Sequence, residues 1–174
     1  MTLRLAALTS AMLLLATGIA TAQDNKPTDP QIAHIAYTAG QIDIEAGKLA
    51  LKKSKNKQVR DFAEDMVRDH TAVNAKALAL VKKLNVTPED NPTSKALLDQ
   101  AKKEHDALSK LNGKAFDKAY AANEVAYHKT VNGALETKLI PSASNSELKD
   151  LLGTGLKIFQ GHEQHAEHLA AEMK

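Results

Sequence analysis

Apolar residues recur at steps of three and four positions along most of the chain, which is the spacing of one face of an α-helix. No stretch alternates apolar and polar residues in the manner of a half-buried β-strand. The pattern predicts a first helix that opens at Asp29-Pro30, with Asp as the cap and Pro at the first helical position. Its apolar seam is predicted to be Ile32, Ile35, Ala39, Ile42, Ala46 and Leu49.

The polar stretch from Lys52 to Lys57 is the predicted turn into a second helix. Pro88 and Pro92 then mark a break, and a shorter helix is predicted from about 94 to 111, stopped by Asn112-Gly113. A long helix over about 114–139 is expected to end before the proline at 141. The last helix is expected to open on a capping box, with a serine at 144 and a glutamate at 147.

These elements amount to four long helices and one shorter connecting helix of about 18 residues, which is typical of a four-helix bundle with one long crossover. A connector of that length returns the chain along the bundle, because each helical residue rises about 1.5 Å. The long helices on either side of it are therefore expected to run parallel. The fold class is all-α, with a single domain over residues 30–174.

Two segments 58 positions apart share the pattern V-x-x-H-x-x-V-N, one around His70 and the other around His128. In a helix, the valines three positions on either side place each histidine on an apolar face. His162 interrupts the apolar seam of the last helix in the same way. The crossover topology brings all three histidines to about the same level, halfway along the bundle. Asp69 points about 100° away from His70 and is expected at the surface.

Glu124 lies near the centre of an apolar helical face, four residues before His128, where a carboxylate is costly unless it is paired, protonated or bound to a cation. Glu45 flanks the predicted seam of the first helix at a similar depth. Three imidazoles and one or two carboxylates suit zinc, copper or iron rather than calcium or magnesium. The sequence therefore predicts a metal site formed by His70, His128, His162, Glu124 and Glu45.

Other cofactor chemistries find less support in the residues. No glutamate has a histidine three positions after it, which disfavours a di-iron centre of the kind found in helical bundles. The chain has no cysteine, so zinc-thiolate sites, iron–sulfur clusters, disulfides and C-x-x-C-H haem attachment are excluded. Met66 and His162 form only a weak axial pair for haem.

The first 22 residues have the character of a secretory signal peptide: Arg4, an apolar run from 5 to 19, and a small-residue cleavage site at Ala20-Thr21-Ala22. Residues 23–29 are then expected to form a flexible start of the mature chain. The mature protein is expected to be periplasmic or secreted. Without Arg4, the chain has 22 basic and 21 acidic residues, and the two kinds are interleaved along the sequence as on a solvated helix surface. Nucleic-acid binding is not indicated. The mature chain has no apolar run long enough to predict a membrane span.

Several segments resemble a bacterial domain-of-unknown-function family, number 4142. The resemblance covers nearly all of the mature chain. It rests on the segment from Val59 to His70 with its Met-Val-x-Asp-His element, the segment from Glu45 to Ala50, the Phe-Asp-x-x-Tyr element at 116–120 leading to His128, and His162. It implies an exported protein with a ferritin-like helical bundle and no established activity. The sequence before His128 departs from the family pattern, and Glu124 lies in that departure.

Two function classes follow. The first is transition-metal binding at mid-bundle, in the service of metal handling or protection against envelope stress; no residue pattern supports catalysis. The second is a metal-free bundle with a structural or protein-interaction role in the cell envelope, either as a homo-oligomer or with an envelope partner. In that class, the buried Glu and His residues form a polar layer that fixes how the helices pack.

Overall fold

The computed structural model describes residues 26–173, and within that range nearly every residue is helical. The predicted signal peptide over 1–22 and the first residues of the segment 23–29 lie outside the described part. The elements are α1 (Asp29–Lys53), α2 (Lys57–Lys83), α3 (Pro92–Ser109), α4 (Gly113–Ala134), the π-helical turn η1 (Leu135–Leu139), the short α5 (Ile140–Ser142) and α6 (Ser146–Glu172).

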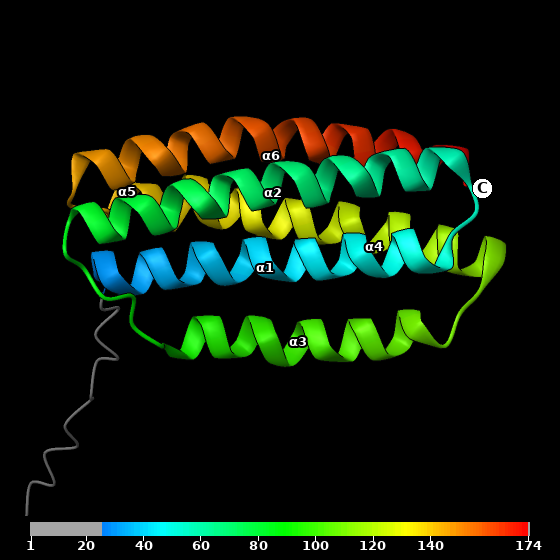
Figure 1. Cartoon of the computed structure of the whole chain (residues 1–174), viewed down its shortest axis with the longest axis horizontal. Coiled ribbons are helices and arrows are strands. Elements are labelled where there is room, and N and C mark those ends of the chain that lie inside the picture. The colour runs from blue at the N-terminus through cyan, green and yellow to red at the C-terminus, as the bar shows by residue number, and fades with distance from the viewer. Residues whose placement is uncertain (1–25, 174) are drawn as a thin grey trace, which may run out of the picture.

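Four long helices, α1, α2, α4 and α6, form the bundle, and α3 lies outside it along α1 (Figure 1). The chain reverses between α1 and α2, returns through α3, and enters α4 at the end from which α2 also started. Helices α2 and α4 therefore run in the same direction. This confirms the predicted all-α, ferritin-like bundle with a helix in the crossover. No helix within residues 26–173 is both long and apolar enough to cross a membrane.

The starts of α1 and α6 each differ by one residue from the prediction. Thr28, not Asp29, caps α1, in a capping box with Gln31. Asn145, rather than a box of the serine at 144 with the glutamate at 147, caps α6 by accepting from the backbone N–H of Leu148. The carboxylate of Asp29 instead accepts the backbone N–H groups of residues 144 and 145, at 2.8 and 2.9 Å, and so ties α1 to the start of α6.

The face of α1 that enters the core is rotated from the predicted seam. Asp43 and Gly47 are buried, whereas Ile42 and Ala46 are only partly so. A Cβ on Gly47 would lie 2.9 Å from a methyl carbon of Val67, so the glycine permits α1 and α2 to approach closely. The residues Ile42, Ala46 and Leu49 face α3, where they line a groove with its leucines. Helix α1 thus has two apolar faces, one for the bundle and one for α3.

The sequence predicts that the helix of α4 ends before Pro141, but it continues through η1 to Ser142. A proline in a helix lacks the N–H donor and crowds the carbonyl four residues before it. The chain accommodates this with a wider turn, in which the N–H of Ile140 donates to the carbonyl of Leu135, five residues back.

Two apolar clusters fill the bundle, one on each side of its middle. One contains Phe62, Met66, Phe116, Tyr120 and Leu169, and the other contains Ile32, Leu135, Leu139, Leu152 and Phe159. The positions between them on the four helices are buried but polar: Asp43, His70, Glu124, His128 and His162. Apolar contacts on both sides hold the helices at the level where these groups meet.

Candidate metal centre

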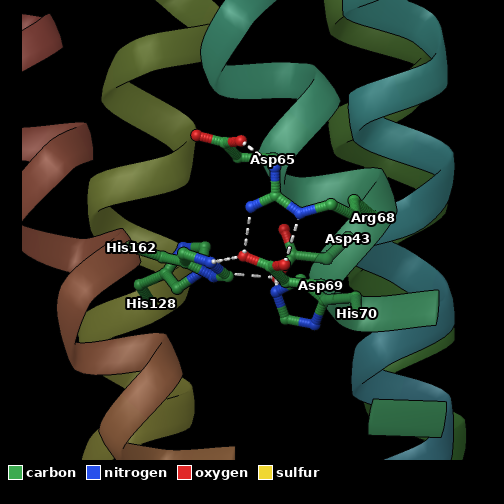
Figure 2. A network of polar contacts seen from close by, with 7 residues as sticks. All are labelled: Asp43, Asp65, Arg68, Asp69, His70, His128 and His162. Carbon is green, nitrogen blue, oxygen red and sulfur yellow. Dashed lines mark hydrogen bonds and ion pairs between the residues drawn. The ribbon is translucent and has the colours of Figure 1, made fainter. Parts of the chain in front are cut away.

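Three histidines from three helices meet at mid-bundle, as the sequence predicts: His70 on α2, His128 on α4 and His162 on α6 (Figure 2). One ring nitrogen of each lies within 4.8 Å of the corresponding nitrogen of the other two. The ring centroids are 5.3 to 5.8 Å apart. The three residues are between 1% and 7% exposed, so the imidazoles face one another away from solvent.

His128 is oriented by its own helix. Its Nδ1 lies 3.0 Å from the backbone carbonyl oxygen of Glu124, to which an Nδ1–H donates. That bond leaves the lone pair on Nε2, which is buried and has no hydrogen-bond partner among residues 26–173. Nε2 lies 3.6 Å from Oδ2 of Asp43. A nitrogen in this state is ready to bind a cation.

His162 is oriented by a second helix, through Asp69 on α2. Its Nε2 lies 3.0 Å from Oδ2 of Asp69, and its Nδ1 is buried without a partner in the described chain. Arg68 binds both oxygens of Asp69, at 2.8 and 3.0 Å, and also reaches Asp65 at 2.6 Å (Figure 2). Hydrogen bonding from Arg68 lowers the pKa of Asp69, which keeps it an anionic acceptor for the imidazole. Asp69, expected at the surface, is in fact only 26% exposed at its side chain.

His70 lies against the ring of Phe159, stacked at a centroid distance of 4.4 Å and an interplanar angle of 6°. Its Nε2 is 3.1 Å from Oδ2 of Asp43, but the approach is not aligned as a hydrogen bond. Burial lowers the pKa of His70 to about 4, against a smaller opposing effect of Asp43. Burial also lowers the pKa of His162. Both rings are therefore neutral near pH 7, the form that ligates metals.

Asp43, rather than the predicted Glu45, is the carboxyl group of α1 that reaches the cluster. Glu45 is exposed and pairs with Lys48 at 2.8 Å, so it does not join the cluster. Two residues along a helix lie about 200° apart around its axis, so rotation of the α1 face exchanges the one for the other. The sequence signal for Asp43 is its place between Gly40 and Gly47, because glycines in a helix interior mark a close approach.

Glu124 is fully buried, as the sequence predicts, with Oε2 3.6 Å from Nδ1 of His128. Neither of its carboxyl oxygens has a hydrogen-bond partner among residues 26–173. Burial and then the nearby Asp43 raise its pKa well above the usual range. Burial thus favours the protonated form of Glu124 in the metal-free protein, and a bound cation would favour its ionised form.

Two overlapping sets of side chains can hold an ion: His70, His128 and His162 in one, and Asp43, Glu124 and His128 in the other. Together they offer imidazole nitrogens and carboxyl oxygens in the buried middle of the bundle. This donor set fits zinc, copper or iron and is a poor match for the all-oxygen shells of calcium and magnesium. Of the five residues predicted from the sequence, the structure brings four together and excludes Glu45.

Solved structures show the same fold at low sequence identity. A protein described as secreted, of the DUF305 family from Streptomyces coelicolor, aligns with a TM-score of 0.68 and 12% identity, over 82% of this chain and 91% of that one. CopM in its Cu(II)-bound form aligns with a TM-score of 0.65 and 12% identity, over 86% of this chain and 99% of that one. Curated proteins provide no significant match.

The sequence itself matches one family over most of its length. Residues 15–169 fit the family described as "Domain of unknown function (DUF4142)". The match spans all four bundle helices except the last residues of α6. This chain therefore belongs to the DUF4142 family.

Proposed function

We propose that the protein binds one transition-metal ion at mid-bundle through His70, His128 and His162, with Asp43 as a fourth ligand. The observation that supports this most is the state of the ring nitrogens. His128 Nε2 and His162 Nδ1 are buried without partners among the described residues, while the opposite nitrogen of each ring is bound to an acceptor. Buried polar atoms normally have partners, and metal-ligating histidines normally donate their other N–H outward.

Copper(II) is the ion we favour. Sites with nitrogen and oxygen donors bind copper(II) more tightly than the other divalent ions of the first transition row. The similarity in fold to CopM, which was solved with Cu(II), supports the same choice. Zinc and iron are the competitors that the donor set also admits.

Glu124 completes the charge of the site. Three neutral imidazoles carry no charge, so a divalent ion in the interior needs nearby anions. Ionised Glu124 and Asp43 would balance the ion, and Glu124 would release its proton when the ion binds. Its oxygens also lie close enough to Asp43 and His128 to share in coordination.

The role we propose is metal handling in the cell envelope, namely binding and buffering an ion or protecting the envelope from it. The signal-peptide character of residues 1–22 and the secreted description of the DUF305 neighbour support a periplasmic or secreted location. A buried ion held by four protein ligands suits holding rather than turnover, and we assign no reaction to the site.

A metal titration of the purified mature chain tests this proposal. Isothermal calorimetry with Cu(II), Zn(II) and Fe(II) should give one site per chain, filled most tightly by copper and with proton release. His162→Leu should abolish tight binding, whereas His168→Leu should not, because His168 is exposed on the same helix. If no ion binds more tightly than about micromolar, or the two variants bind alike, the cluster is a metal-free polar layer and the bundle is a structural or interaction protein.

A further inference from the structure

An elongated cavity of about 620 Å³ leads from the metal centre toward one end of the bundle. Its inner end is lined by Asp43, His70 and Phe159. On α1 the lining extends from Asp43 to Gln31, which corresponds to about 18 Å at the rise of an α-helix. Its mean cross-section is then roughly 35 Å², from that volume and helix rise. The space, called the tube below, lies among the four bundle helices and the start of α3.

The wall of this tube is mainly alanine, valine, leucine and isoleucine from α1, α2, α4 and α6. Among its lining residues, the acidic and basic side chains are Asp43 and His70 at the inner end and Lys138 at the outer end. A compact polar ligand would lose its hydration there and gain few hydrogen bonds in return, because amide and hydroxyl side chains are a minority of the lining. An apolar chain has no hydrogen bonds to water to lose, and it would bury its surface there.

The tube opens between the start of α3 and the end of α4. The lining residues that are exposed lie there: Pro92 and Thr93 on α3, and Thr130, Ala134 and Lys138 on α4 and η1. The π-helical turn η1 forms one side of this mouth, with Lys138 in it. Such turns are rare and occur frequently at functional sites.

We propose that this tube binds a single-chain anionic amphiphile of the fatty-acid class. The hydrocarbon chain lies inside with its end toward Phe159, and the carboxylate lies at the mouth beside Lys138. The reverse orientation is disfavoured, because Asp43 offers an anionic head no positive charge and the apolar wall offers few donors. The site goes beyond metal binding and does not require it, since the wall forms from the packed helices alone.

Calorimetry with laurate and the chelator-treated protein tests the proposal separately from the metal site. Laurate should bind with one site per chain. Ala77→Phe places a ring in the tube and should weaken binding by at least about tenfold, whereas Ala79→Phe, on the exposed side of the same helix, should leave it unchanged. Absence of saturable binding, or equal binding by the two variants, would overturn the proposal.

Chain length provides a second test on the unmodified protein. Affinity should rise about fourfold for each methylene that enters the tube, from hexanoate to laurate, and should stop rising toward stearate once the tube is full. A rise that continues unchanged to stearate would indicate surface adsorption and contradict the tube. Lys138→Glu should weaken laurate but not dodecanol, which has the same chain without the charge. An equal effect on both would place the head elsewhere.

Discussion

Each of two histidines in the centre is held by an acceptor outside it, and the two acceptors differ in kind. His128 bonds to a backbone carbonyl of its own helix, which no substitution removes. His162 bonds to the side chain of Asp69, which Arg68 in turn holds. The orientation of His162 therefore depends on side chains that a single substitution changes.

Asp69→Asn should weaken metal binding by about 10- to 100-fold, because an amide is a weaker acceptor for the imidazole N–H and leaves its ring less basic. Competition with a chromogenic chelator measures this. The matched control is Asp65→Asn, which also removes a partner of Arg68 but does not contact His162. Equal losses in the two variants would assign the effect to Arg68 rather than to Asp69.

The lowered pKa of His70 makes the metal-free protein sensitive to acid. The unfolded chain binds the proton near pH 6.5 and the folded chain only near 4, so acidification through that window favours unfolding. From pH 7 to 5, His70 alone should cost about 2 kcal/mol of unfolding free energy. Urea unfolding with a chelator present should show wild type losing more stability than His70→Leu over this range. The same loss in both would show that His70 titrates normally in the folded state.

At the scale of elements, periodicity predicted the helices well because each has one strongly apolar stripe. The residue count of the connector also predicted the parallel direction of α2 and α4. Periodicity does not predict the core face of α1, because the apolar stripe through Ile42, Ala46 and Leu49 faces α3. Periodicity alone does not show which of two apolar faces enters the core, and for this reason it indicates Glu45 in place of Asp43. The contact of Asp69 with His162 is not predictable for a related reason: the direction of a side chain on α2 does not reveal which residue of α6 lies opposite it.

Gly47→Ala should destabilise the protein although alanine favours helix. The added methyl would lie 2.9 Å from a Val67 carbon and 3.1 Å from the backbone oxygen of Ala63, so α1 and α2 must separate. We expect a loss of about 1–3 kcal/mol in urea unfolding. Gly153→Ala in α6, where nothing lies within 4 Å of the new methyl, should instead gain up to about 1 kcal/mol. A gain in both would mean that the contact of α1 with α2 is loose at Gly47.

At the scale of the molecule, the free energy of unfolding has two separable contributions: apolar packing and binding of the proposed ion. Apolar clusters on both sides of the centre hold the bundle without metal. A bound ion should then add stability by mass action, about 4 kcal/mol at a free concentration a thousand times Kd, or roughly 10 °C in Tm. Calorimetric melting with Cu(II), and again after a chelator, measures the difference. A Tm that copper leaves unchanged in wild type would contradict binding to the folded state.

The crossover through α3 has a consequence for when the ion can be captured. The proposed ligands come one each from α1, α2, α4 and α6, so no hairpin contains a complete set. Any partly folded chain with a bundle helix undocked lacks at least one of them. In the proposed site, tight capture would therefore be a late event that requires finished assembly, and an ion offered to a partly folded chain would find only isolated, weakly binding histidines.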